Sequence, residues 1–367
     1  WRYNLLRLHG WTGDGIMSSV ADKLIKAKTA SSNSRTGGFE VAALVDTTSN
    51  VRVLDVQDVE NITVTSSTSA GALVNGYSVD AISDDTYLYV ANGKYNNAAL
   101  NSYDVSDETN ISLADSIQSN SIFNGLSHIA GDWDNDFLFV STSNNYDLHV
   151  YDISDPTNMV KVQTYTNSTT APYPFSTVVD SANLNVYLLN FSRGKLSSFS
   201  YDASSGALTH LSTLSNASLD GLYQAIDLDN QVIYVMDILQ RRLTSVDISN
   251  PSSMSVLDYI SIPGGGNYIA LDVGRQLAFV GKDTIHCIDI SDPSNLTQLS
   301  TIGITDNTAI DFVTEMQCDT DREYLFAACS HSGKIVVIDY SDTSSLSVAG
   351  TTATSTVVSH RTFTLLR

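Results

Sequence analysis

The chain has 367 residues, of which 42% are hydrophobic and only 16% charged, and its net charge is −21. The hydrophobic content is sufficient for a packed core, and the acidic balance argues against nucleic acid or an anionic membrane as a partner, because both would repel it. No run approaches the ~18 apolar residues that a membrane-spanning helix needs, and no signal peptide is visible. Because the chain begins at Trp1 and not at Met, we expect a processed product or a fragment.

Residues 1–38 form a segment that we expect to lie outside the main domain. They contain two tryptophans and three closely spaced leucines, namely Trp1, Leu5, Leu6, Leu8 and Trp11. Residues 1–40 hold six Lys or Arg and three acids, a net of +3, which leaves −24 for the rest of the chain. We therefore predict a basic, apolar arm that packs on its own domain, binds a protein partner or docks on another copy of the chain. A solvated tail is the alternative.

From residue 39 onward, one phrase recurs seven times. It consists of an apolar strand that ends in Asp, a polar turn and a second strand. The anchoring aspartates are Asp55, Asp104, Asp152, Asp202, Asp247, Asp289 and Asp339. A repeat in the forties of residues with one strand-turn-strand unit per period is typical of a β-propeller blade.

Each repeat extends backwards into a four-stranded blade. Two further apolar strands precede the Asp-bearing strand, as in LSHIAGD from Leu126 followed by DFLFVST from Asp136, and as in IDFVTEM from Ile310. The first repeat lacks its first strand, while residues 357–366 are left over at the other end. We predict an all-β fold in which residues 39–367 form a seven-bladed β-propeller. The C-terminal strand completes the N-terminal blade and so removes exposed sheet edges.

Several of these phrases resemble those of known propeller families. YDISDPTN, VDISNPSS and IDISDPSN resemble the LVIVD-repeat family of β-propellers. YDASSGALTHL, from Tyr201, is similar instead to the blades of lactonase-type propellers. Both resemblances imply blades, and neither phrase is itself a catalytic motif.

The innermost strand of each blade would line a central channel, where propellers commonly bind ligands. Alignment of these strands predicts one polar level, formed by Ser78, Ser127, Ser176, Tyr223, Tyr268, Asp311 and Ser359. The next level would hold His128, Gln224 and His360, followed by Arg361. Of these, His128, His360, Arg361 and Asp311 could do acid-base chemistry, whereas the simpler interpretation is that the channel residues hold water. A slip of one residue would exchange the inward and outward faces.

The sequence gives little support for a metal or another cofactor. The recurring Asp-x-Ser-Asp-Pro turns offer carboxylates, but Asp and Ser also bond backbone amides in tight turns. Asp132, Asp134 and Asp136 have the alternate spacing of a calcium loop, yet Phe137 stands where that loop needs Gly, and no Glu follows at the twelfth position. We predict a hairpin turn here and no cofactor, with calcium as the weaker alternative.

The cysteines and most histidines show no catalytic or metal-ligand pattern. Three cysteines are too few and odd in number for a disulfide framework, so we predict free thiols at Cys287, Cys318 and Cys329. Three histidines in or beside predicted strands should have structural roles, namely His149, His210 and His286. No nucleophile elbow, zinc motif or phosphate-binding loop is present.

These observations favour a non-enzymatic interaction protein. We expect an acidic propeller that is extracellular, on a virion (phage tail or capsid) or on a cell surface, and that is anchored through its N-terminal arm. The first alternative is a lactonase-like hydrolase acting in the channel. The second is a glycan-binding propeller whose loop aromatics, Tyr95, Tyr146, Tyr173 and Trp133, stack on sugars. The fold alone does not decide between them.

Overall fold

The computed structural model describes residues 41–46, 50–69, 78–93, 98–107, 109–191, 194–352 and 360–366. The chain divides into two units, Trp1–Gly38 and Phe39–Arg367, and all described residues belong to the second. The predicted arm, with Trp1, Leu5, Leu6, Leu8 and Trp11, lies outside the described residues. Within the described ranges, no helix has the length and apolarity to cross a membrane.

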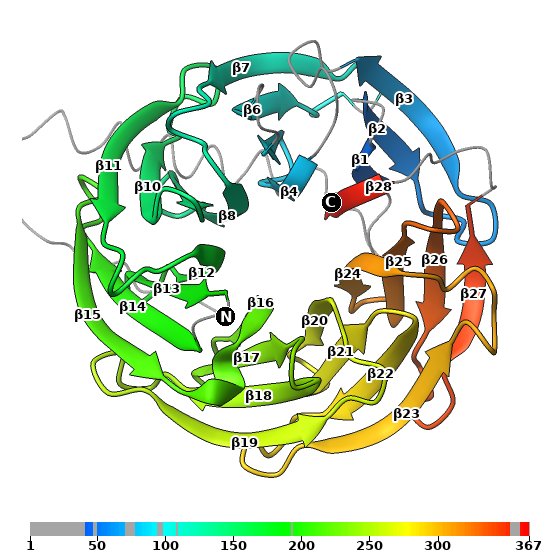
Figure 1. The fold of residues 1–367 in the computed structure, drawn as a ribbon. Helices are drawn as coiled ribbons and strands as arrows, with labels where there is room; N and C mark the ends of the chain where they lie inside the picture. Colours follow the sequence, from blue (N-terminus) through cyan, green and yellow to red (C-terminus); the bar gives the residue numbers. More distant parts are fainter. Residues whose placement is uncertain are drawn as a thin grey trace, which may run out of the picture. The chain divides into compact units, whose positions relative to one another are not determined.

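The described residues form seven four-stranded antiparallel sheets around a common centre (Figure 1). Six sheets are built from four consecutive strands, and the seventh combines the two ends of the chain in the order β28-β1-β2-β3. The strands of this seventh sheet are β28 (His360–Leu366), β1 (Val41–Asp46), β2 (Asn50–Asp55) and β3 (Thr63–Ser69). The β-propeller fold that the sequence predicts is confirmed.

The other six sheets follow in chain order. The second and third contain β4 (Ser78–Ser83), β5 (Tyr87–Asn92), β6 (Ala99–Asp104), β7 (Ser112–Gln118), β8 (Leu126–Asp132), β9 (Phe137–Thr142), β10 (Asp147–Asp152) and β11 (Val160–Thr166). The fourth and fifth contain β12 (Pro174–Asp180), β13 (Asn185–Asn190), β14 (Lys195–Tyr201), β15 (Leu208–Ser215), β16 (Gly221–Asp227), β17 (Val232–Asp237), β18 (Arg242–Asp247) and β19 (Ser255–Ser261). The last two contain β20 (Tyr268–Asp272), β21 (Leu277–Gly281), β22 (Thr284–Asp289), β23 (Thr297–Gly303), β24 (Val313–Asp319), β25 (Tyr324–Cys329), β26 (Lys334–Asp339) and β27 (Ser347–Thr351). A short 3-10 helix, η1 (Ala217–Leu219), precedes β16.

The ring closes by antiparallel pairing of the C-terminal strand with the first one. In this pairing Leu366 lies opposite Val41, and Phe363 lies opposite Leu44. The predicted completion of the N-terminal sheet by the C-terminal strand is therefore confirmed. Closure leaves only the outermost strands as edges, and a bulge interrupts the pairing of the third and fourth strands in all seven described sheets. Such bulges twist an edge and disfavour its pairing with other chains.

The hydrophobic core lies between neighbouring sheets. Second and third strands such as β5, β6, β9 and β10 are buried along almost their whole length, which explains their nearly continuous apolar runs. One cluster joins Tyr89 and Leu100 of one sheet to Leu138 and Val140 of the next. The free thiols that the sequence predicts are confirmed, with Cys287 and Cys329 buried in such clusters.

The recurring aspartates hold the turns that give the sequence its repeat. In each copy the first aspartate accepts the N–H two residues further on, as from Ser106 to Asp104 (3.0 Å) and from Ser341 to Asp339 (2.8 Å). The turn then packs on the preceding sheet, where the Ser245 hydroxyl donates to the Pro293 carbonyl at 2.6 Å. The predicted scaffold role of this phrase is thus confirmed by its hydrogen bonds.

One predicted strand is misplaced. The innermost strand of the last repeat begins at Val313 and not at Ile310, so Asp311 and Phe312 lie in the preceding loop. Phe312 has a φ of +55°, which no regular strand residue adopts. The apolar run from Ile310 misled the alignment, because Ile310 is a buried loop residue.

Candidate functional site in the central channel

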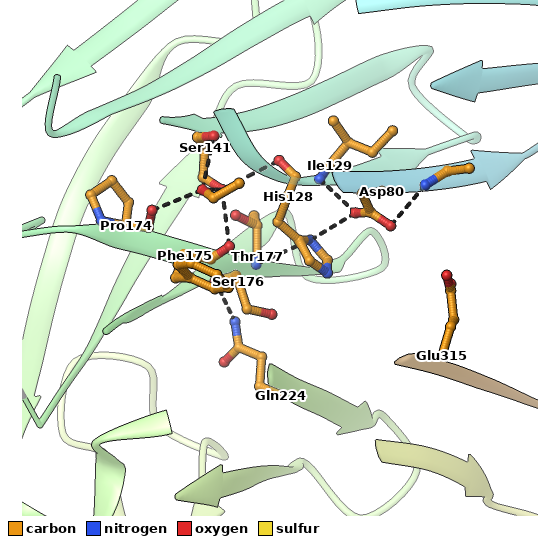
Figure 2. A network of polar contacts seen from close by, with 12 residues as sticks. Asp80, His128, Ile129, Ser141, Pro174, Phe175, Ser176, Thr177, Gln224 and Glu315 are labelled. Carbon is orange, nitrogen blue, oxygen red and sulfur yellow. Dashed lines mark hydrogen bonds and ion pairs between the residues drawn. The ribbon is translucent and has the colours of Figure 1, made fainter. Parts of the chain in front are cut away.

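The strand register shows which innermost side chains lie at the same level. Asp80 pairs with Ala91, His128 with Ser141, and Glu315 with Ala328, at corresponding positions of their sheets. In the six sheets other than the one that contains β28, this level consists of Asp80, His128, Ser176, Tyr223, Tyr268 and Glu315. Figure 2 shows several of these residues around the centre of the ring.

This level corrects the sequence alignment. Ser176, Tyr223 and Tyr268 lie together as predicted, but His128 takes the place given to Ser127, and Glu315 the place given to Asp311. The first difference, of one residue, follows from the bulge between Leu126 and His128, and the second, of four residues, arises because the innermost strand begins at Val313 and not at Ile310. Of the other candidates, Ser359 lies outside the described residues, as do the side chains of Ser78, His360 and Arg361.

Asp80 is the most constrained group at this level. Asp80 is 5% exposed, and its carboxylate accepts the N–H of Ala81 (2.9 Å) and the N–H of Ile129 on the next innermost strand (2.8 Å). His128 Nδ1 lies 3.4 Å from Asp80 Oδ2. Burial raises the pKa of Asp80 above its ordinary value, and the nearby His128 and the two amides oppose the shift only in part.

The same kind of link recurs around the ring. The Thr177 N–H donates to His128 Nδ1 at 3.4 Å, and the Gln224 side chain donates to the Ser176 carbonyl at 2.8 Å (Figure 2). Gln317 Oε1 accepts the N–H of Leu365 at 2.8 Å. Each bond joins one innermost strand to the next. Because these strands belong to different sheets, their side chains supply hydrogen bonds that a shared sheet would otherwise provide.

Aromatic side chains occupy this level on β16 and β20. The Tyr223 ring lies 4.8 Å from the Tyr268 ring and 6.3 Å from the Phe175 ring. The Tyr268 hydroxyl donates to Glu315 Oε1 at 3.3 Å. Burial raises the pKa of Tyr268 well above its ordinary value, and the charges of Glu315 and Asp80 raise it further. Tyr268 therefore stays protonated and cannot serve as a base at neutral pH.

Hydroxyl groups beside this level are mostly engaged with the backbone. The Ser127 hydroxyl donates to the Pro174 carbonyl at 2.9 Å and lies 3.0 Å from the Ser141 hydroxyl. Among the buried side-chain oxygens that have no hydrogen-bond partner in the described residues, Ser176 Oγ, Thr177 Oγ1 and Gln224 Oε1 lie at or next to this level. Buried polar atoms of this kind are usually satisfied by ordered water.

Two channel residues were missed in the sequence, Asp80 and Glu315. A usable signal exists, because each residue of this level stands four positions before the aspartate at the innermost turn. Counting back from Asp84 gives Asp80, and counting back from Asp319 gives Glu315. Asp311, the predicted candidate, instead contacts His331 at 3.3 Å in an exposed loop.

The weak metal candidate forms a hairpin turn, as predicted. Asp132 is fully buried, and its carboxylate accepts the N–H groups of Asp134 (3.1 Å) and Asn135 (3.2 Å), the Asn135 side chain (2.8 Å) and the Tyr201 hydroxyl. Asp136, at a φ of +57°, ends the turn. Among the described residues, no group of three or more His, Cys, Asp or Glu could hold a metal ion.

The remaining candidates pack against their neighbours. His149 contacts the Thr164 hydroxyl (2.9 Å) and the Ile122 carbonyl (3.2 Å), as expected of a structural histidine. The Tyr146 and Tyr173 rings lie 5.3 Å apart in a T-shaped pair, and the Trp133 ring stacks on Tyr89 at 5.7 Å. Tyr95 lies outside the described residues.

The seven sheets, the closing strand and the polar channel define a β-propeller protein. Within it, residues 132–167, 233–259 and 276–302 match the LVIVD repeat. These segments contain YDISDPTN, VDISNPSS and IDISDPSN, the phrases that suggested this family in the sequence.

Solved structures of similar fold share little sequence with the chain. A protein from Lactobacillus plantarum is 14% identical with a TM-score of 0.75, over 90% of this chain and 100% of that one. A functionally unknown protein from Desulfotomaculum acetoxidans is 13% identical with a TM-score of 0.72, over 89% and 99%. The periplasmic gluconolactonase PpgL of Pseudomonas aeruginosa is 12% identical with a TM-score of 0.70, over 89% and 99%. No curated protein matches the sequence.

Proposed function

We propose that the chain is a non-enzymatic interaction protein, a seven-bladed propeller displayed outside the cell, on a virion or on a cell surface and anchored through its N-terminal arm. The observation that carries this proposal is the contrast between a channel full of structural hydrogen bonds and one strongly acidic outer face. Of the described channel groups with acid-base chemistry, Asp80 and His128 are tied to the backbone of the next strand. These hydrogen bonds to backbone N–H groups occupy Asp80 Oδ2 and His128 Nδ1, atoms that a general base would use to accept a proton from a substrate.

The acidic face is built from turns and is called the turn face below. Strand directions alternate within each sheet, so the turn between the first and second strands lies at the same end as the turn between the third and fourth. The exposed acids on these described turns are Asp58, Glu60, Asp85, Asp107, Asp134, Asp155, Asp202, Asp229, Asp292, Asp321 and Asp342. The cations on the same turns are Arg275 and Arg322, which pair with Glu323 (3.0 Å) and Asp319 (2.7 Å). Such a face favours cationic partners and repels anionic ones.

The N-terminal segment supplies the expected anchor. It is basic and apolar, in contrast to the acidic domain that follows it. Light scattering on the full chain and on a shortened chain that starts at Gly38 tests this role. We expect the full chain to assemble and the shortened chain to be a monomer with an unchanged circular dichroism spectrum. A shortened chain that assembles equally well would contradict the anchoring role.

A second candidate is a hydrolase that works in the channel on a lactone. It is favoured by the Asp80–His128 pair, by Glu315 at the same level of the ring, and by the gluconolactonase among the structural neighbours. Hydrolysis of glucono-δ-lactone by the full chain tests it, with His128→Gln and Glu315→Gln as variants and Asp229→Asn as a surface control. Turnover that both channel variants abolish and the control keeps would replace the non-enzymatic proposal. The absence of turnover above the uncatalysed rate would remove this candidate.

A further inference from the structure

The chain contains six Asn-x-Ser/Thr sequons, the acceptor sequence for asparagine-linked glycans. They begin at Asn61, Asn110, Asn167, Asn190, Asn216 and Asn295. A chain rich in Asn, Ser and Thr contains such triplets by chance, so the sequence alone does not separate acceptors from structural residues. The structure separates them, because an acceptor needs an exposed side chain whose Nδ2 atom is not used by the fold.

Three of these asparagines have side chains that support the fold. Asn190 is fully buried, and its Nδ2 donates to the carbonyls of Leu188 (3.1 Å) and Lys195 (3.3 Å). Asn167 and Asn216 hold local turns, where Oδ1 accepts the backbone N–H two residues further on at 2.9 Å. A glycan on Asn190 would break its hydrogen bonds and has no room in the core, so this sequon cannot be used in the folded chain.

The other three asparagines occupy one equivalent position of the repeat. They stand on the turns between third and fourth strands, which are called the outer turns here. Asn61, Asn110 and Asn295 are exposed, and their side chains make no hydrogen bond within the described part of the chain. The backbone N–H of each donates to the carbonyl of the aspartate three residues earlier, at 2.9–3.0 Å. The backbone therefore fixes the turn and leaves the side-chain amide available.

The residue after each of these asparagines explains why the sequon faces solvent. Ile62, Ile111 and Leu296 are 5–7% exposed and belong to the hydrophobic clusters between sheets. Successive residues of an extended chain point to opposite sides, so the asparagine and the hydroxyl residue two positions later both face outward. The hydroxyl residues are exposed as well, namely Thr63, Ser112 and Thr297.

The three sequons lie on one arc of the ring. They precede β3, β7 and β23, whereas the outer turns before β11, β15 and β19 contain no sequon. Figure 1 shows β23, β27, β3 and β7 following one another along the rim. Exposed apolar side chains on the opposite arc, such as Val160 (48%) and Tyr259 (55%), have no sequon on the outer turns beside them.

We propose that Asn61, Asn110 and Asn295 are modification sites that carry asparagine-linked oligosaccharides. The inference rests on the proposed display outside the cell, since this modification belongs to exported chains. The donor is a polyprenyl pyrophosphate that carries the oligosaccharide. A bond forms between Asn Nδ2 and C1 of the first sugar, Nδ2 loses one proton, and the bond from C1 to the pyrophosphate breaks, so that the lipid pyrophosphate leaves with the electron pair. The glycans cover one arc of the ring and leave the other arc open to a protein partner.

Peptide mass mapping of the full chain, exported through a eukaryotic secretory pathway, tests the three sites. We expect the folded, secreted chain to carry a glycan on each of them and none on Asn190. Thr63→Val, Ser112→Ala and Thr297→Val remove only the hydroxyl of the sequon, and each should abolish the glycan on the asparagine two residues earlier. Absence of glycan from all three sites, or equal occupancy of Asn190 in the folded chain, would overturn the inference.

A matched variant in the third sheet should gain a site. Asn158 is exposed at the equivalent position of its outer turn, and its N–H donates to the Asp155 carbonyl at 2.9 Å, but Val160 stands where the hydroxyl is needed. Val160→Thr keeps a β-branched residue at this exposed strand position and should add one glycan, on Asn158. If Asn158 stays unmodified in this variant while the three sites are occupied, the outer-turn position does not determine modification and the structural assignment is wrong.

Light scattering on the same material separates this inference from the anchoring function. A chain that carries the three glycans but remains a monomer contradicts the anchor and supports the sites. A chain that assembles through its arm but carries no glycan supports the anchor and contradicts the sites.

Discussion

The innermost strands and the turn face are both polar, but their polar side chains are used differently. On the innermost strands, Asp80, His128 and Gln224 bond the backbone of the neighbouring strand. On the turn face, carboxylates such as Asp134 and Asp229 project into solvent. A polar residue in a propeller channel can therefore be structural, while the residues available for partners stand on the turns. The predictions below measure this difference.

The largest effect is expected at a buried turn aspartate. Asp132→Ala leaves the amides of Asp134 and Asn135 and the Tyr201 hydroxyl without their acceptor. We expect the free energy of unfolding to fall by about 2–4 kcal/mol, measured by equilibrium unfolding in urea. Asp134→Ala, two residues away and exposed, is the control and should change stability by less than about 0.5 kcal/mol. Equal losses would show that burial does not separate the two classes of aspartate.

A smaller loss is expected when a link between innermost strands is removed. Asp80→Ala leaves the Ile129 N–H buried without its acceptor, at a cost of about 1–3 kcal/mol. Thermal and urea unfolding measure this loss.

Because burial raises the pKa of Asp80, the folded wild type binds a proton at higher pH than the unfolded chain does. The ionised carboxylate is therefore the less favourable form in the fold, and the wild type should gain stability relative to the variant as the pH falls through this pKa. A constant difference across the acid range would contradict the structural account of Asp80.

The pH dependence should have the opposite sign at a buried histidine. Burial lowers the pKa of His149, and Asp147 and the Ile122 carbonyl offset the shift only in part. Its contribution to stability is complete above about pH 6.5, the ordinary value for histidine, and is lost as the pH falls through the lowered pKa. His149→Gln should reduce stability near pH 8 and flatten the loss between neutral and acid pH. His331→Gln, at a residue whose side chain is 62% exposed, should leave the profile unchanged.

The smallest effect on stability is expected on the outer turns. Asp155→Asn keeps the oxygen that accepts the Thr157 N–H, so the free energy of unfolding should stay within the error of the measurement. The hydrogen bonds from Thr157 lower the pKa of Asp155, which keeps this carboxylate ionised below the ordinary range. A loss comparable to that of Asp132→Ala, measured under the same conditions, would mean that the acidic face also supports the fold.

The fold was predictable because it repeats. A period set by Asp55, Asp104 and their counterparts, with a strand on each side of a turn, leaves few alternatives to a propeller. The leftover C-terminal strand could be matched to the incomplete first sheet, since a closed ring removes unpaired edges. The buried histidine His149 was predictable for the same reason, because its place in the blade was known.

The channel level was only partly predictable, because a bulge displaces one of its members by one residue and the innermost strand of the last sheet begins three residues later than its apolar pattern suggests. Ser176 and Tyr223 were placed correctly, whereas Ser127 was taken for His128 and Asp311 for Glu315. Apolar periodicity does not reveal a bulge, and Ile310 continued the apolar pattern into a loop. The sequence also does not show that Asp132 is buried and Asp134 exposed, because both residues stand in one turn. The structure is needed to distinguish them.

The most direct test of this account is the mass of the full chain in solution as a function of salt. If the acidic turn face and the basic arm hold copies together, light scattering at about 0.05 M salt should give a mass well above the 39.7 kDa of one chain. The mass should fall towards that of one chain at about 1 M salt, where the screening length is only ~3 Å. A mass of one chain under both conditions, or an assembly that salt does not weaken, would contradict the central claim.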